Sequence, residues 1–457
     1  MFFVVSGASI FFLFGLGYLA ANALCLKNDH APFAEKFPLI MIAGFLVNHL
    51  ILLLSQSLKL SLLLGVMIGG CGLAWFLMRW KKEMISDRRG DWIPMAAIAL
   101  ILLLHYLTVL YAPLDAWDWD ARSIWFFHAK MIWSAESINL NAGWNHPSVQ
   151  FSHVDYPMLV PALAAQFSYA LGYWNEYAPK FSLFLLFLPA IFWIFSFYSR
   201  RLSFLFLVLV FPFGFKILLW NGYLDGYIAL YAAISMLLLG RYFQEQRFLD
   251  LMSAVSCLAL LSNMKNEGIL LGLIGAAAIA VTGMLSTTFK WNEFKKHLNI
   301  YRMGWLIVMM APCILWSVFY RYQWRLVNDL QIGTADALFR MSSRFLDGVS
   351  FPLILKETMF HQENFFRPLS SSVWLAFALF FAGIILLTIF KRYIVGWIPA
   401  LMMAVAYYGC VLAIYLMTPH DLIWHLGTSV HRTMLTVSSC IFAGTFFVLK
   451  EIEDATV

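Results

Sequence analysis

The sequence predicts an all-α, polytopic membrane protein, and three observations support this fold class. Of its 457 residues, 62% are hydrophobic and only 12% are charged. The mean hydropathy is +0.76. Apolar runs of about 17 to 25 residues, the length that crosses a bilayer as a helix, recur along the chain. A soluble domain of ordinary composition is therefore excluded, and lipid must act as the solvent.

By this length criterion we expect about 13 transmembrane helices. The first ones cover residues 2–24, 37–54, 58–80 and 92–112. The later ones cover residues 181–198, 204–220, 226–239, 249–262, 268–283, 303–320, 373–390, 394–417 and 433–449. The stretch 157–174 is short and carries Pro157 and Pro161 near its start, so we expect it to be bent or re-entrant rather than spanning.

Basic residues orient these helices. The loop 79–91 holds the densest cluster of basic side chains, namely Arg79, Lys81, Lys82, Arg88 and Arg89. Because loops rich in Lys and Arg stay in the cytoplasm, this loop is predicted to be internal and the long loop 114–156 external. The net charge of +6 is spread over such short loops, which gives no basic stripe for nucleic acid.

The external loop begins with the stretch LDAWDWDARSIWFFHAK, which contains Asp115, Asp118 and Asp120. Carboxylates at a bilayer boundary are candidate reaction centres because charge is costly there. Asp118 and Asp120 form a DxD pattern that suits a divalent cation such as Mg²⁺ or Mn²⁺, or general-base work. An aromatic belt with incidental acids, or a helix N-cap, explains the same residues without chemistry.

The same loop is predicted to contain an amphipathic helix that lies in the membrane interface. Arg122, Trp125, Ala129 and Trp133 follow one another at helical spacing, with Lys130 around the turn.

Several later segments place polar residues on the same external face. In NMKNEG, Lys265 could hold a phosphate, although snorkelling with a local ion pair to Glu267 explains it equally. In PHDLIWHLGTSVHR, His425 and Arg432 would share one helical face. Arginine suits bidentate contact with phosphate, but an arginine here is also an ordinary interfacial anchor. The remaining candidate binding residues are Asp225, His153, Asp155, Arg122 and Lys130.

Residues 322–370 form a long polar segment with basic residues among apolar ones. This pattern is typical of short helices on the membrane surface. The segment could bind an acceptor or a lipid, and the sequence does not decide between them.

The order of the polar motifs resembles the GT-C superfamily of membrane glycosyltransferases, the group that contains protein O-mannosyltransferases and aminoarabinose transferases. The motifs are WDARSIWFFHAK, HVDYPMLVP, GYLDGYIALY, NMKNEG and TPHDLIWHLGTSVHR. They run from about residue 114 to 432 and look most similar to uncharacterised bacterial GT-C-like proteins. Three spans precede the usual first one, and the first loop carries an extra acidic residue.

The resemblance implies a GT-C-like helix bundle with a juxtamembrane helix in the first catalytic loop. It implies transfer of a sugar from a polyprenyl-phosphate carrier to a hydroxyl of a glycan, lipid or protein acceptor. The catalytic base carried over by position is Asp120, with Asp118 as second choice. Asp225, Lys265 and the element with His153 and Asp155 match further family positions. The location implied is the bacterial inner membrane, with the active site facing the periplasm.

We therefore expect N-terminal extra helices at 1–91, and a GT-C-like core at 92–321 with the acidic loop 113–156. The outer polar segment at 322–370 and C-terminal helices at 371–457 follow. Two rival functions remain. An O-antigen ligase or polymerase would use external Arg and His without needing the aspartates. A transporter or flippase of a lipid-linked sugar would bind the headgroup without any chemistry.

Overall fold

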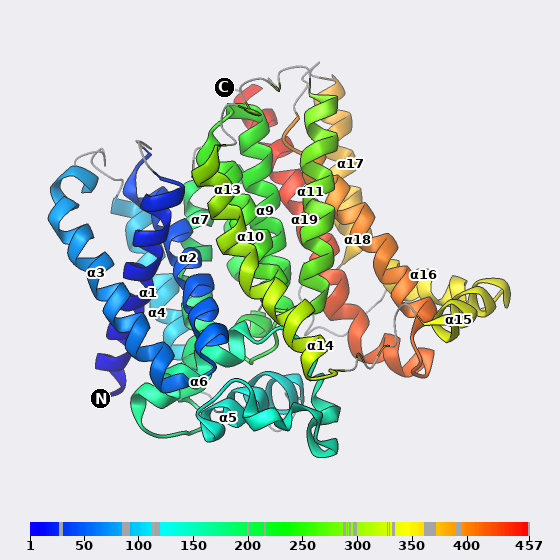
Figure 1. The fold of residues 1–457 in the computed structure, drawn as a ribbon. Helices are drawn as coiled ribbons and strands as arrows, with labels where there is room; N and C mark the ends of the chain where they lie inside the picture. Colours follow the sequence, from blue (N-terminus) through cyan, green and yellow to red (C-terminus); the bar gives the residue numbers. More distant parts are fainter. Residues whose placement is uncertain are drawn as a thin grey trace.

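The computed structural model describes residues 1–26, 31–84, 92–111, 113, 119–198, 201–213, 216–286, 289, 291, 294–295, 299–326, 328, 330, 334–360, 372–389 and 395–455 (Figure 1). In these residues ten helical stretches are long and apolar enough to cross a membrane. They are α1 (Phe2–Leu24), α2 (Phe33–Ser55), α3 (Leu58–Met84), α4 (Trp92–Tyr111), α7 (Phe181–Ser196), α9 (Asp225–Glu245), α11 (Asn266–Leu285), α13 (Ile300–Ile314) with its continuation to Gln323, α18 (Ile398–Met417) and α19 (Leu422–Ala455).

Shorter helices complete the fold. Those of apolar sequence are α6 (Leu159–Leu171), α8 (Arg201–Val208), α10 (Phe248–Ser262) and α17 (Val373–Ile389). The others are the π-helical turn η1 (Ala121–Trp125), α5 (Phe126–Ala135), α14 (Arg321–Gln323), α15 (Ala335–Leu346) and α16 (Ser350–Phe360). The helical, multi-pass membrane architecture is thus confirmed, whereas the expected number of about 13 crossings stays a prediction.

The span expected at 204–220 is not one regular α-helix. Instead of one helix over 204–220, α8 ends at Val208 and a π-helical turn covers Leu209–Phe213. A 3₁₀ turn then covers Lys216–Leu219. Pro212 lies inside the π-helical turn, and proline removes a backbone donor and crowds the preceding turn, which explains the break.

Helices α1, α2 and α3 pack through glycine. A Cβ atom on Gly17 would lie 1.7 Å from the Ile40 carbonyl oxygen, and one on Gly44 would lie 2.0 Å from the Leu13 carbonyl oxygen. Lipid tails are as apolar as leucine, so helices in a bilayer gain by bringing their backbones into close contact at small residues. This glycine-mediated contact is what holds the N-terminal helices together.

Helices α7 and α9 run in the same direction, and this defines two ends of the molecule. Near their starts, the Tyr227 hydroxyl donates to the Leu183 carbonyl at 2.8 Å. Near their ends, Arg241 donates to the Ser196 carbonyl at 3.0 Å and forms a buried two-point ion pair with Asp250. We call these the Asp225 end and the Arg241 end, after the residues on α9.

Helix α6 begins and ends at the Asp225 end. Its first amide, from Leu159, donates to the Asn263 carbonyl at 3.3 Å, and Asn263 follows the last residue of α10. Its later residue Phe167 packs against Phe181, the first residue of α7, with ring centroids 4.5 Å apart. The stretch 157–174 therefore does not cross the bundle, which agrees with the expectation of a non-spanning segment.

Candidate functional site

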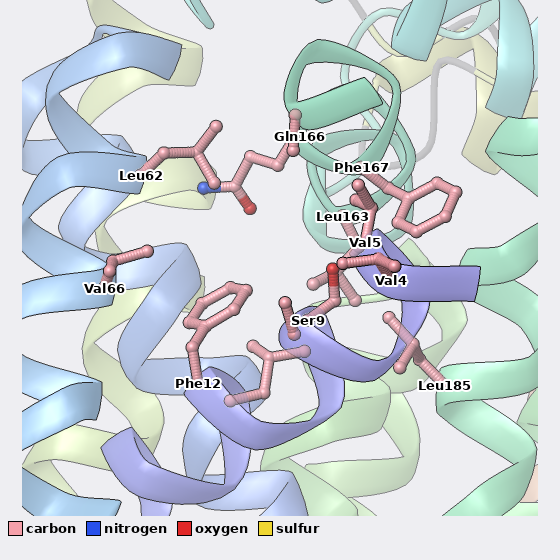
Figure 2. Close-up of a pocket in the computed structure, with 13 residues that line it drawn as sticks. Val4, Val5, Ser9, Phe12, Leu62, Val66, Leu163, Gln166, Phe167 and Leu185 are labelled. Atoms are coloured by element: carbon pink, nitrogen blue, oxygen red, sulfur yellow. The ribbon is translucent and has the colours of Figure 1, made fainter. Parts of the chain in front are cut away.

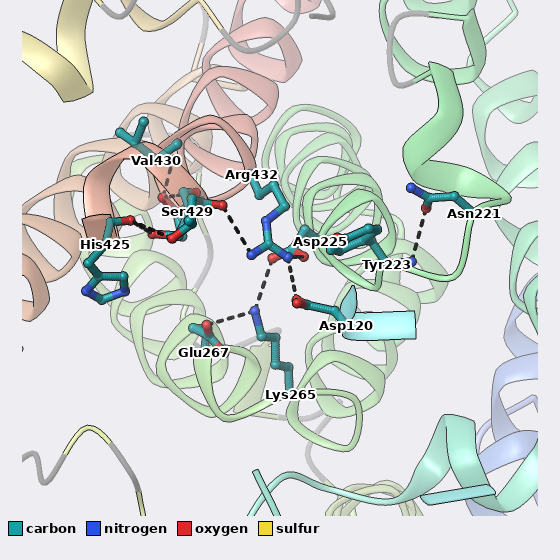
Figure 3. Close-up of polar contacts among 12 residues, drawn as sticks. Asp120, Asn221, Tyr223, Asp225, Lys265, Glu267, His425, Ser429, Val430 and Arg432 are labelled. Atoms are coloured by element: carbon teal, nitrogen blue, oxygen red, sulfur yellow. Dashed lines mark hydrogen bonds and ion pairs between the residues drawn. The ribbon is translucent and has the colours of Figure 1, made fainter. Parts of the chain in front are cut away.

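Charged side chains from four distant segments meet at the Asp225 end (Figure 3). Asp225 opens α9, and Lys265 and Glu267 flank the start of α11. Asp120 comes from the external loop, immediately before η1. Arg432 lies in the first half of α19, a helix that begins at this end of the molecule. We call these five residues the charged network.

The network is a chain of ion pairs with Asp225 at its centre. Lys265 Nζ lies 3.0 Å from Asp225 Oδ1 and 3.0 Å from Glu267 Oε1. Arg432 Nη1 lies 3.3 Å from Asp225 Oδ2 and also pairs with Asp120. The order is thus Asp120, Arg432, Asp225, Lys265, Glu267, with acidic and basic groups alternating.

Burial makes this pairing necessary. The Asp225 and Lys265 side chains are 8% and 10% exposed, and a buried charge without a partner is strongly unfavourable. Three carboxylates nevertheless face only two permanent cations within the network. A phosphate entering the site would add negative charge and would compete with these carboxylates for Lys265 and Arg432.

The Lys265 ammonium stays charged in this setting. Burial alone would lower its pKa, but the carboxylates of Asp225 and Glu267 outweigh burial and hold the pKa well above its usual value. Because the folded pKa is raised, the ion pairs stabilise the fold fully below the ordinary lysine pKa, and this stabilisation is lost only at still higher pH. Lys265 therefore acts as a fixed cation and not as a proton donor at neutral pH.

Aromatic rings line the two cations. The Arg432 guanidinium carbon lies 4.7 Å from the ring centre of Tyr223, and Lys265 Nζ lies 5.8 Å from that of Tyr156. Tyr156 in turn stacks on Trp125 at 5.4 Å and on His153 at 5.0 Å. The rings limit where each cation can move and keep water from this side of the network.

Asp155 belongs to a second polar cluster beside the charged network. Its Oδ2 accepts from the side-chain amides of Asn266 at 2.7 Å and Asn328 at 2.9 Å. Arg321 lies 3.7 Å from the same oxygen. Since Asn266 follows Lys265 and Tyr156 follows Asp155, this cluster fixes the loop segments that carry the Lys265 side of the network.

The structure separates some residues that the sequence analysis grouped together. His425 lies about two helical turns before Arg432 on α19 and packs against the ring of Tyr415 at 5.1 Å. Arg122 and Lys130 are exposed and have no hydrogen-bond or ion-pair partner among the described residues. His153 stacks on the Tyr156 ring, which lies beside Lys265.

The expected helix of the external loop is present as η1 and α5. Trp125 and Ala129, which were expected at an interfacial surface, are both buried. They lie beneath the loop because Trp125 stacks on Tyr156 and α5 packs on α6. Whether the exposed side of this helix lies in the interface stays a prediction.

The proposed divalent-cation site cannot be placed. Asp118 and Asp115 lie outside the described residues, and Asp120 is paired with Arg432. In the part of the chain that the structure describes, no three His, Cys, Asp or Glu side chains gather as metal ligands. Within the charged network, the positive charges next to the carboxylates are those of Lys265 and Arg432.

Sequence reasoning missed Tyr223, Asn328 and Arg321. Tyr223 precedes Asp225 by two positions in GYLDGY, but its contact with Arg432 depends on how α9 and α19 lie together. Asn328 and Arg321 come from the segment after α13, and only the folded chain brings them to Asp155. Local pattern gives no indication of such pairings.

A cavity of about 250 Å³ lies between α1, α3, α6 and α7 (Figure 2). Its walls are almost entirely apolar and include Phe12, Leu62 and Phe167. The polar residues that line it are Ser9 and Gln166, and the Gln166 side-chain oxygen accepts from Asn48 at 2.6 Å. The cavity therefore fits hydrocarbon and not a charged group.

Comparison with protein-family models, curated proteins and solved structures finds no match to this chain. What the site can do must therefore be argued from its own chemistry. It offers two fixed cations that suit a phosphate, and carboxylates close enough to take up a proton.

Proposed function

We propose that this chain is a GT-C type glycosyltransferase that moves a sugar from a polyprenyl-phosphate carrier to an acceptor hydroxyl. The observation that carries the proposal is the pairing of Asp120 with Arg432, one ion pair away from Asp225 and Lys265. It places a candidate base beside two candidate phosphate ligands. The site would face the periplasm from the bacterial inner membrane, as the positive-inside rule predicts for this loop.

The excess of carboxylates suggests how the donor engages. A phosphodiester oxygen that binds Arg432 would displace Asp120, because Asp225 is fixed at the start of α9 while Asp120 is carried by the external loop. Arg432 would keep Asp225 as its partner. Donor binding thus releases the Asp120 carboxylate at the moment when a base is needed.

In the chemical step, Asp120 would take the proton of the acceptor hydroxyl. The acceptor oxygen would form a bond to the anomeric carbon while the bond from that carbon to the phosphate oxygen breaks. The polyprenyl phosphate leaves with the electron pair, and Arg432 and Lys265 stabilise its developing charge. A single displacement of this kind inverts the anomeric configuration.

The membrane-spanning helices support the choice of a lipid-linked donor. A phosphate carried on a polyprenyl chain reaches a site at the end of transmembrane helices without leaving the bilayer. The apolar cavity beside α6 is one place on the chain that fits hydrocarbon. A Mg²⁺ or Mn²⁺ ion at Asp118 and Asp120 stays a prediction that chelation with EDTA tests.

The test is sugar transfer by the purified protein in lipid nanodiscs, with a panel of polyprenyl-phosphate sugars. Asp120→Asn should reduce the rate by about 10²-fold or more, the usual contribution of a general base. Glu176→Gln is the matched control, since Glu176 is exposed and outside the network. Transfer at an undiminished rate by Asp120→Asn would refute the base assignment.

A transporter or flippase of a lipid-linked sugar is the second candidate. The alternation of carboxylates and cations favours it, because buried ionisable networks near a membrane also mark transport pathways. Movement of the donor across liposomes without any glycosyl transfer would establish this function. An O-antigen ligase or polymerase would instead lose activity in His425→Ala and keep it in Asp120→Asn.

A further inference from the structure

Helix α15 has three distinct faces. An α-helix has 3.6 residues per turn, which puts four residues of α15 on one side: Ala337, Arg340, Met341 and Arg344. The rest of the protein buries these residues partly or fully. A second side carries four exposed apolar residues, which are Leu338, Phe339, Phe345 and Leu346. The narrow third side, next to Phe339, carries the exposed polar residues Asp336 and Ser343, and the exposed Ser342 lies within the apolar side.

The two arginines of α15 donate hydrogen bonds to the carboxyl end of the candidate transmembrane helix α18. Arg340 Nε donates to the Met417 carbonyl at 2.8 Å, and Arg344 Nη1 donates to the carbonyls of Tyr415 at 3.1 Å and Thr418 at 2.8 Å. The last carbonyls of a helix have no partner within it, so these bonds satisfy the carboxyl end of α18. They fix α15 at the level where α18 ends.

This level is the boundary of the membrane. Helix α18 is one of the ten candidate spans and ends at Met417, so the hydrocarbon region is expected to end near this residue. Figure 1 shows α15 and α16 standing out from the side of the bundle, next to the start of α19. An exposed helix at this depth has protein on one side, lipid on another and water on the third.

The three faces match these three surroundings. Phe339 and Leu346 are 74% and 80% exposed, which would be costly in water but is favourable in the acyl region of a leaflet. Asp336 and Ser343 lie between Phe339 and the arginine side of the helix, where water would solvate them. Arg340 and Arg344 donate their hydrogen bonds to α18 and the turn after it, and not to lipid headgroups.

We propose that α15 lies in the membrane interface, with Leu338, Phe339, Phe345 and Leu346 among phospholipid acyl chains. Through Arg340 and Arg344 it then holds the corner between α18 and α19 at a fixed depth. Arg432 follows this corner on α19, so the lipid surface helps to position one cation of the charged network. The proposal does not depend on the reaction that the network performs.

The test places the photoreactive residue p-benzoylphenylalanine at Phe339 in the full chain, reconstituted in liposomes of phosphatidylethanolamine and phosphatidylglycerol. Irradiation should give a phospholipid adduct, identified by its mass. The same residue at Asp336, exposed on the polar side of the same helix and farther around it from Phe339 than Ser343, should give no such adduct. An adduct to a second copy of the chain, or no adduct at all, would overturn the proposal.

A second experiment asks whether the apolar face causes insertion. With the photoreactive residue at Leu338, the double change Phe339→Glu and Leu346→Glu should abolish the lipid adduct. The control change Asp336→Asn, on the water flank, should leave the adduct yield unchanged. Persistence of the adduct in the double variant would mean that protein contacts alone hold α15 at this depth, against the proposal.

Discussion

Single residues in the charged network differ in how many partners depend on them. Asp225 pairs with both cations, whereas among the described residues Asp120 pairs with Arg432 and Glu267 pairs with Lys265. Removing an outer carboxylate therefore leaves each cation with Asp225. Removing the Asp225 carboxylate leaves Lys265 and Arg432, both mostly buried, with one carboxylate partner each. The two cations then repel each other, because no negative charge remains between them.

Asp225→Asn should accordingly cost about 3 kcal/mol of folding free energy, the scale for breaking a buried ion pair. Glu267→Gln should cost about 1 kcal/mol or less, because its side chain is 21% exposed and Lys265 keeps its main partner. Thermal and denaturant unfolding in detergent measure both values. Equal losses for the two variants would contradict the central role of Asp225.

His128 on α5 is a second residue whose environment predicts behaviour. It is completely buried, and its Nε2 lies 2.9 Å from the Ser152 hydroxyl. Burial, with the neighbouring His153 in second place, lowers the pKa of the imidazole to about 3. The folded protein thus keeps this side chain neutral where the unfolded chain would protonate it.

The consequence is a loss of stability in acid. Because the folded pKa is lowered, the contribution of His128 is complete above about pH 6.5 and declines as the pH falls toward 3. At pH 5 the decline amounts to about 2 kcal/mol. The free energy of unfolding of the His128→Gln variant should change less between pH 7 and pH 5 than that of the wild type. For the exposed control His146→Gln, the free energy of unfolding should change with pH as it does in the wild type.

The first three helices, α1, α2 and α3, have similar apolar sequences but pack against one another at specific positions. Their glycines face neighbouring backbones, as at Gly15, where a Cβ atom would lie 1.9 Å from the Gly69 carbonyl oxygen. Other glycines of the same helices have open space around them, as at Gly7 and Gly70. Composition alone does not distinguish the two kinds of position.

Gly17→Ala should therefore destabilise the protein by about 2 kcal/mol, because the added methyl group must push α1 and α2 apart. Gly7→Ala in the same helix meets nothing within 4 Å and should be neutral or slightly stabilising. Unfolding temperatures of the two variants in detergent test the contrast. Similar effects at both positions would argue against close packing of α1 on α2.

For the whole molecule, the two ends defined by α9 give a topology that can be measured. The charged network, α5 and α15 belong to the Asp225 end, and Arg241 with Asp250 belongs to the other end. Helix α10 returns from one end to the other over 15 residues, and α11 starts back at the Asp225 end. The positive-inside rule predicts that the Asp225 end is external.

Reporter fusions check this orientation. Alkaline phosphatase joined after Gly143 or Gly348 should be active, since both residues lie at the Asp225 end. Fusion after Gln246, in the turn between α9 and α10, should give an inactive enzyme. Activity at Gln246 would reverse the assignment and would move the charged network to the cytoplasmic side.

Much of the fold could be predicted locally. Hydropathy placed α1, α3 and α4 within a few residues, because a membrane span is a property of consecutive side chains. It failed at 204–220, where Pro212 interrupts an apolar run that has sufficient length. It placed the last span at 433–449, whereas α19 covers Leu422–Ala455 and so also includes the polar stretch that was expected to be helical but not to belong to the span.

The candidate site divides in the same way. Sequence alone identified the members of the charged network, because isolated charges are conspicuous in a chain with so few of them. It also grouped them with Arg122, Lys130 and His425, which lie outside the network. Charge and topology can assign residues to one side of a membrane, but they cannot say which side chains touch.

The sequence by itself determined that this is a helical membrane protein, and it predicted that the motifs with Asp120, Asp225, Lys265 and Arg432 share one side of the membrane. Both follow from free energies of transfer, which depend on each segment alone. Only the tertiary structure decided that Asp120 pairs with Arg432, 312 residues away, and that Asp225 joins Arg432 to Lys265. An ion pair depends on two positions in space, and those positions are set by the packing of all the helices between them.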